Sequence, residues 1–215
     1  MNNKIAKTLL IIAFFIFTVL FLFINKVTSL SKLSKEQLRN IGYYQYDVPK
    51  KISAFNLISD NQQVIDNEFF LDSWTLVYFG YSRCPSECPV TMSQIRDLFS
   101  ALESDDFATN NKKVLLISID PENDSSVIID NYAKAFNPNF VGAVGTRPML
   151  LSLATQLDIR VVQPRKNHNH SGSLEHLEGH MNNLILMDQD GNYHGFFRLP
   201  NTVENLITAY KAITE

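Results

Sequence analysis

The chain has 215 residues, of which 45% are hydrophobic and 19% are charged, a composition typical of a globular protein and not of a disordered one. It carries 19 Lys and Arg residues against 22 Asp and Glu residues, for a formal net charge of -3. This balance argues against a nucleic-acid-binding protein, which would show a basic surplus.

An uncharged apolar run occupies residues 8–24 near the N-terminus. Its length is at the short end of what crosses a bilayer as a helix. The alternative interpretation is a cleaved secretory signal, but the run is longer than the apolar core of most such signals. Lys4 and Lys7 precede the run, which favours an N-terminus on the inner side of the membrane. We therefore expect an anchor at 1–26, a tether at 27–48 and one domain at 49–215. We expect the protein to cross a bacterial inner membrane once, with this domain in the periplasm.

Short apolar runs alternate with helical patterns along the domain, which predicts an α/β sheet covered on both faces. A strand that leads into a cysteine-bearing helix, with a hairpin and a helix at the end, favours a thioredoxin-like fold. The turn signal Asp190-Gly191 marks that hairpin. The predicted strands are 75–80, 113–119, 140–144, 159–162, 183–187 and 193–198. The predicted helices are 89–102, one capped by Asp124 or Ser125 that runs to about 136, 146–156 and 201–213.

Both cysteines of the chain, Cys84 and Cys88, lie where the first of these strands passes into a helix. On a helix this spacing places two side chains on one face, and the helix N-terminus lowers the pKa of a thiol. Three interpretations are open: a structural disulfide, a redox dithiol and a metal site. Redox dithiols usually have two intervening residues, and here there are three, which suits a metal ion better.

A third ligand has to come from elsewhere in the chain, and the histidines are the candidates: His168, His170, His176, His180 and His194. His180 directly precedes the predicted strand 183–187 and is the best placed. His168 and His170 would form an auxiliary site or none, and we expect His194 at the surface. A structural zinc site needs four ligands, whereas two thiolates and one imidazole suit Cu(I).

Four segments, YFGYSRCPSECP, LLISIDPEND, FVGAVGTR and HMNNLILMDQDG, resemble those of the Sco/SenC family, copper proteins of cytochrome c oxidase assembly. The resemblance runs from about residue 51 to residue 213. It implies a thioredoxin fold, a membrane anchor and copper bound by Cys84, Cys88 and His180. The chain departs from the family pattern at Ser86, Glu87 and Gly179, and none of these departures removes a ligand.

The resemblance and the residues together predict a copper metallochaperone and not an enzyme. The cargo would be Cu(I), with Cu(II) as the second oxidation state, and the recipient would be the dinuclear copper site of cytochrome c oxidase subunit II or another cuproprotein. Other periplasmic copper carriers would be further partners. The alternative is a thiol-disulfide oxidoreductase, with Cys84 and Cys88 as catalytic residues, that reduces cuproprotein cysteines before metal loading. Asp120 and Asp124 are expected to be turn or cap residues and not ligands.

Overall fold

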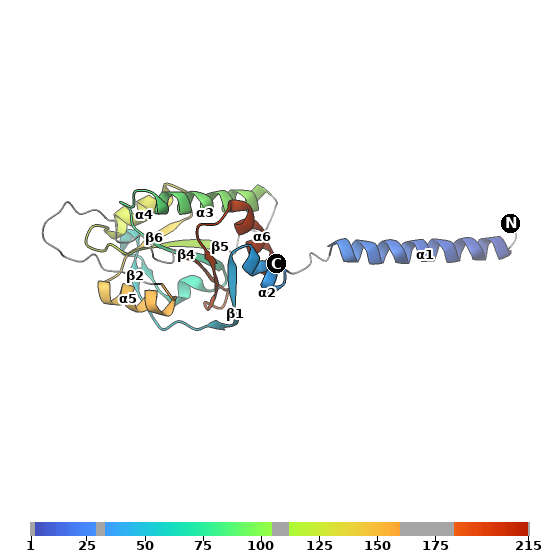
Figure 1. Cartoon of the computed structure of the whole chain (residues 1–215), viewed down its shortest axis with the longest axis horizontal. Coiled ribbons are helices and arrows are strands. Elements are labelled where there is room, and N and C mark those ends of the chain that lie inside the picture. The colour runs from blue at the N-terminus through green and yellow to red at the C-terminus, as the bar shows by residue number, and fades with distance from the viewer. Residues whose placement is uncertain (1–2, 29–32, 105–111, 160–182, 215) are drawn as a thin grey trace.

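The computed structural model describes residues 3–28, 33–104, 112–159 and 183–214. The centre of the domain is one six-stranded sheet (Figure 1). Its strands are β1 (Tyr43–Lys50), β4 (Trp74–Gly80), β5 (Lys112–Ser118), β6 (Val141–Ala143), β7 (Asn183–Met187) and β8 (Tyr193–Arg198).

The spatial order of the strands is β1-β8-β7-β4-β5-β6. β4, β5 and β6 are parallel, whereas β7, β8 and β1 continue the sheet in antiparallel pairs. A separate two-stranded sheet consists of β2 (Leu57–Ile58) and β3 (Val64–Ile65). Short 3-10 helices, η1 (Asp60–Gln62) and η2 (Asn67–Phe70), flank β3.

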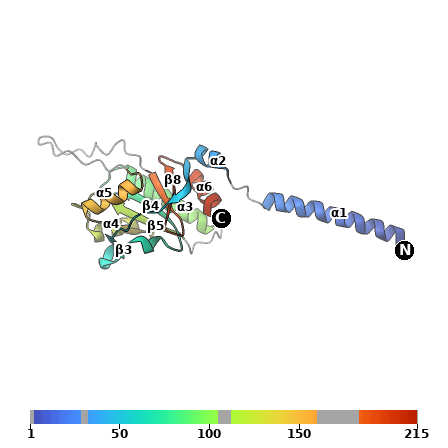
Figure 2. The same ribbon diagram turned by 90° about the horizontal axis from the view of Figure 1, so that it is seen from below.

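Helices cover both faces of the large sheet, as Figures 1 and 2 show. One face carries α3, α4 and α6, and the other carries α5. The helices of the domain are α2 (Lys35–Asn40), α3 (Glu87–Ser104), α4 (Ser126–Lys134), α5 (Arg147–Gln156) and α6 (Val203–Thr214). This arrangement confirms the predicted α/β sheet with two covered faces.

The central strands read as continuous apolar runs because side chains alternate between two buried faces. In β4, Leu76 belongs to the core on the α3 face, and its neighbour Val77 belongs to the core on the α5 face. In β5, Leu116 and Leu115 divide in the same way. All four side chains are fully buried, so this sheet centre fixes where β4 ends and the cysteine loop begins.

The segment expected to be a tether contributes to the domain. α2 lies within it, and β1 begins at Tyr43 and pairs with the edge of β8, Tyr43 opposite Phe197 and Tyr44 opposite Phe196. Of the predicted strand 159–162, only Ile159 is described, and it is not in a strand.

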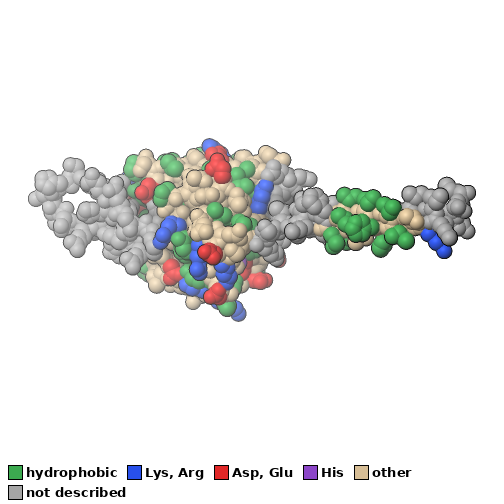
Figure 3. Space-filling view, turned by 45° about the vertical axis from the view of Figure 1, so that its right-hand side comes forward, with side chains coloured by type: hydrophobic (Ala, Val, Ile, Leu, Met, Phe, Trp, Pro, Cys, Tyr) green, Lys and Arg blue, Asp and Glu red, His purple; other side chains and the backbone are tan. Residues whose placement is uncertain are grey.

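The N-terminal helix, α1 (Asn3–Thr28), lies outside the sheet and its covering helices (Figure 1). Figure 3 shows apolar side chains exposed along it. Leu10, Phe14 and Phe17 are among the exposed residues. Within the described ranges, no helix has the combination of length and apolarity that crossing a membrane requires. The predicted membrane-spanning helix is therefore not confirmed. On the domain, Figure 3 shows acidic and basic side chains interspersed.

Candidate metal centre

The cysteine loop lies between the last residue of β4, Gly80, and the first residue of α3, Glu87. The backbone N–H of Cys84 donates to the carbonyl oxygen of Tyr81 at 3.3 Å, which folds the loop back toward the strand end. Cys88 is the second residue of α3, so this helix begins two residues earlier than its sequence pattern predicts. Strand, loop and helix start thus hold both cysteines at one end of the domain.

The two thiols are free and lie side by side. The backbone N–H of Cys88 donates to the Sγ of Cys84 at 3.3 Å. Cys84 is half-buried, whereas Cys88 is only 3% exposed. One sulfur is therefore within reach of solvent or a partner, and the other is enclosed by the core.

Burial dominates the chemistry of the second thiol. Burial and, after it, the neighbouring Cys84 side chain raise the pKa of Cys88 to about 12. A backbone hydrogen bond from Tyr81 and the phenol of Tyr78 act in the opposite direction. The expectation that the helix N-terminus lowers the thiol pKa is wrong for Cys88, because desolvation of the anion outweighs the helix dipole there.

Two tyrosines of the strand end surround the sulfurs. The hydroxyl of Tyr78 donates to the Sγ of Cys88 at 3.8 Å. Tyr81 contacts Cys84, and burial together with the charge and hydrogen bonding of that cysteine raises the pKa of the Tyr81 phenol well above its ordinary value. Gly80 leaves room for this arrangement, since a Cβ there would lie 3.1 Å from both the Cys88 Sγ and the Tyr78 Cε1.

A buried carboxylate, that of Asp124, holds the cysteine loop through hydrogen bonds. Asp124 is 2% exposed and accepts hydrogen bonds from the backbone N–H of Ser82 at 3.1 Å, the Ser118 hydroxyl at 2.6 Å and the Ser82 hydroxyl. Of the two cap candidates, Ser125 is the one that caps α4: its hydroxyl accepts a hydrogen bond from the Ile128 N–H at 3.3 Å. Asp124 therefore ties the end of β5 to a residue two positions before Cys84, a role that the sequence pattern did not indicate.

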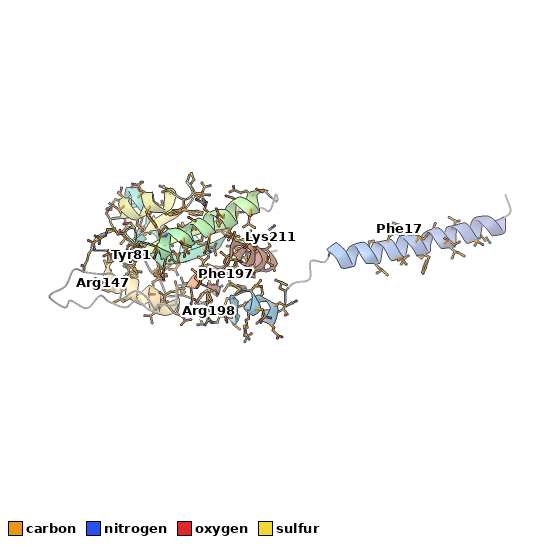
Figure 4. The ribbon with its side chains drawn as sticks, turned by 45° about the horizontal axis from the view of Figure 1, so that its top comes forward. Phe17, Tyr81, Arg147, Phe197, Arg198 and Lys211 are labelled. Carbon is orange, nitrogen blue, oxygen red and sulfur yellow. The ribbon has the colours of Figure 1, made fainter. Side chains whose placement is uncertain are left out.

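Two ion pairs lie at the surface around this loop. Arg83 pairs with Asp120 at 3.0 Å, and Arg147, at the start of α5, pairs with Glu122 at 2.9 Å. Figure 4 shows Tyr81 and Arg147 at the same end of the domain, far from Lys211 on α6. Exposed pairs of this kind add little stability, so they shape the charge around the thiols more than they hold the fold.

The histidines divide between described and undescribed parts of the chain. His168, His170, His176 and the predicted ligand His180 lie outside the described residues. In the part that is described, no group of three or more His, Cys, Asp or Glu side chains could hold a metal ion. The place of His180 beside the two sulfurs therefore stays a prediction.

His194 is half-buried, and the expectation of a surface residue is wrong. Its Nδ1 lies 2.7 Å from the Tyr43 hydroxyl and its Nε2 lies 3.2 Å from the Gln45 Nε2. Trp74 packs edge-on against the ring at a centroid distance of 5.1 Å. Burial lowers the pKa of His194, so this histidine is a neutral member of the β1–β8 edge and not part of the thiol site.

The donor set at the loop fits copper. Soft thiolate sulfurs select Cu(I) over harder ions, and here two sulfurs lie side by side with one of them accessible.

A family model described as SCO1/SenC matches residues 45–215. The chain belongs to the SCO1/SenC family. BsSco, which is 16% identical with a TM-score of 0.60, is described as a member of the Sco family of cytochrome c oxidase assembly proteins.

Curated relatives and a solved structure agree with this membership. A "Putative copper-binding protein" of Stutzerimonas stutzeri is 26% identical over 157 residues, which is 73% of this chain and 74% of the relative. The mitochondrial SCO1 homolog of Homo sapiens is 29% identical over 168 residues, 77% of this chain but only 52% of the human protein. The structure of Bradyrhizobium japonicum ScoI with copper bound is 26% identical, with a TM-score of 0.59, and the match covers 74% of this chain and 96% of ScoI. The expected thioredoxin-like fold is thus that of the Sco proteins.

Proposed function

We propose that this Sco-family chain is a copper metallochaperone that holds its cargo between Cys84, Cys88 and His180. The observation that supports this most directly is the pair of free thiols at the start of α3. The backbone N–H of Cys88 donates a hydrogen bond to the Sγ of Cys84 at 3.3 Å. Two thiolates and one neutral imidazole offset the charge of Cu(I) and leave a coordination position open. The copper-bound ScoI relative has the same fold.

The difference in burial between the two cysteines suits the release of a cargo. Cys88 is enclosed, whereas Cys84 is half-buried and lies where an acceptor can approach. An incoming thiolate or imidazole of the acceptor can bind the ion before Cys84 leaves it, so no free ion is released. The proposed recipient is the dinuclear copper site of cytochrome c oxidase subunit II, or another cuproprotein, with other periplasmic copper carriers as further partners.

A Cu(I) titration of the reduced full chain against a competing chelator tests this proposal. We expect one tightly bound equivalent for the wild type, and loss of tight binding in Cys84→Ser and in Cys88→Ser. We expect His180→Ala to weaken binding while both thiols remain. A Cys84→Ser/Cys88→Ser double variant that still binds one equivalent tightly would rule the chaperone out.

One observation favours a second function. An accessible Cys84 beside an enclosed Cys88 is the arrangement of a dithiol that reduces a partner's disulfide. Cys84 would attack the partner, Cys88 would then attack the mixed disulfide, and the two electrons would leave a Cys84–Cys88 disulfide and a reduced partner dithiol. His180→Ala separates the two functions, because copper delivery would be impaired while dithiol exchange would largely continue.

The proposal includes a position for the domain. α1 exposes apolar side chains such as Leu10 and Phe14, 70% and 73% exposed, that suit a lipid environment. The domain would then lie in the periplasm, tethered to the inner membrane beside the oxidase. Fractionation with protease treatment of intact and lysed spheroplasts tests this: the domain should pellet with membranes and be cleaved in intact spheroplasts.

A further inference from the structure

Tyr78 is a fully buried phenol with an oriented hydroxyl. It is 1% exposed, and its hydroxyl donates to the Cys88 Sγ at 3.8 Å. A hydrogen bond from Thr91, one turn after Cys88 on α3, also reaches the Tyr78 phenol. Because Thr91 supplies the proton that the phenol oxygen accepts, the phenol's own proton is directed at the sulfur.

A second phenol serves the other cysteine. Tyr81 is 6% exposed and hydrogen-bonds with the side chain of Cys84, and both cysteines contribute to its raised pKa. Each sulfur of the pair therefore has one buried phenol beside it. The two tyrosines come from β4 and the residue that follows it, so the same strand that positions the loop positions both donors.

A third phenol lies near the pair without a partner. The hydroxyl of Tyr132, on α4, is buried and has no hydrogen-bond partner in the part of the chain that is described. Cys88, Cys84 and Asp124 all act on it electrostatically. Its ring packs edge-on against Phe136 at a centroid distance of 5.3 Å. This hydroxyl makes no hydrogen bond to either sulfur and only their charge acts on it, so Tyr132 is not one of the donors.

Copper binding creates a negative charge on the sulfurs. A thiol must release its proton to become a ligand, and a sulfur as enclosed as that of Cys88 loses hydration when it becomes an anion. Hydrogen bonds to an ionised acceptor are about twice as strong as neutral ones. Donors that are already in place therefore stabilise the copper-holding form more than the free thiol form.

From this geometry we propose that Tyr78 and Tyr81 form a set of phenol donors that stabilises the two cysteine sulfurs in their copper-holding form and so sets how strongly the site holds its cargo. This inference rests on the proposed copper function. The phenols keep their protons throughout, and the protons that copper displaces from the thiols go to solvent.

Phenylalanine substitutions test the set, because they remove only the hydroxyl. The variants are Tyr78→Phe and Tyr81→Phe in the full chain. The matched control is Tyr210→Phe on α6, since Tyr210 is 1% exposed and burial alone raises its pKa. Thr91→Val is a second variant that leaves Tyr78 in place but removes the partner that orients it.

The first measurement is Cu(I) affinity by chelator competition on reduced protein. We expect Tyr78→Phe to weaken binding about tenfold, the size of one hydrogen bond to a charged acceptor. Tyr81→Phe and Thr91→Val should weaken it several-fold, and Tyr210→Phe should not change it. Wild-type affinity in all the site variants overturns the inference alone, whereas a wild type that binds no Cu(I) overturns the proposed function and this inference together.

The second measurement separates hydrogen bonding from packing. Hydrogen bonds to a ligand sulfur lower its electron donation to the metal. The sulfur-to-copper charge-transfer band of the Cu(II)-loaded protein should therefore move to longer wavelength in Tyr78→Phe and stay in place in Tyr210→Phe. Equal shifts in both variants would mean that the phenols act through packing, and the inference would fail.

Discussion

The backbone N–H of Cys88 lies 3.3 Å from the Sγ of Cys84 and donates to it. The first turn of α3 has N–H groups without partners inside the helix, and one of them points at the more accessible sulfur. The same helix turn buries the sulfur of Cys88. The two thiols are thus chemically unequal, although they are only four positions apart.

This inequality predicts different alkylation rates. The pKa of Cys88 is raised by burial to about 12, so its thiol stays protonated at neutral pH and is shielded as well. The Cys88→Ser variant, which keeps Cys84, should react with iodoacetamide at pH 7.5 at least about tenfold faster than Cys84→Ser. Mass spectrometry of quenched samples gives the two rates, and equal rates would contradict the structure.

Copper affinity should depend on pH. Because burial raises the pKa of Cys88 to about 12, the free protein carries that proton between pH 6 and 8, and copper must displace it. Each displaced proton makes the apparent Cu(I) affinity rise about tenfold per pH unit. Chelator competition at pH 6, 7 and 8 measures this slope. A flat profile would show that Cys88 is not a ligand, and Cys88→Ser should lower the slope by about one.

Removing the Asp124 carboxylate should destabilise the domain. Ser82 and Ser118 donate to this buried group, and an uncharged or shortened side chain would leave these donors without a strong acceptor. We expect Asp124→Ala to lower the free energy of unfolding by about 1.5–3 kcal/mol in urea titrations. Glu122→Gln is the matched control: its exposed pair with Arg147 should be worth less than about 1 kcal/mol. Similar losses in the two variants would contradict the role of Asp124.

His194 should make the domain sensitive to mild acid. Burial lowers its pKa in the folded protein, while Asp188 opposes this and Lys35 adds to it. In the unfolded chain the pKa of this histidine is higher, about 6.5, so the unfolded chain binds a proton more readily than the folded protein. The free energy of unfolding therefore has its full value above about pH 6.5 and falls as the pH drops toward the pKa of the folded protein. His194→Gln should show a shallower loss of unfolding free energy between pH 7 and 5. An unchanged slope would mean that other groups carry the acid sensitivity.

The sequence predicted the centre of the fold and missed its edge, for a physical reason. β4 and β5 are buried on both faces, so their apolar runs mark them within one or two residues. β1 is an edge strand with mostly half-exposed or exposed residues, and it includes Pro49. Its strand character comes from pairing with β8, far away in the chain, and no local pattern records that contact.

The sequence likewise predicted one part of the candidate site and missed another. The spacing of Cys84 and Cys88 at a strand-to-helix turn was enough to predict that their sulfurs lie together. The burial of Cys88 and the link from Asp124 to the loop depend on packing between distant elements, so no local pattern indicates them. Helix position alone predicted a lowered thiol pKa, and the core around Cys88 reverses it.

If the protein works as proposed, the two sulfurs of this loop bind one copper ion together. X-ray absorption at the copper edge, on the full chain loaded with one equivalent of Cu(I), measures this. We expect two sulfur neighbours and one nitrogen neighbour around the metal, with one sulfur lost in either Cys84→Ser or Cys88→Ser. A spectrum with no sulfur neighbours, or one unchanged by both substitutions, would contradict it.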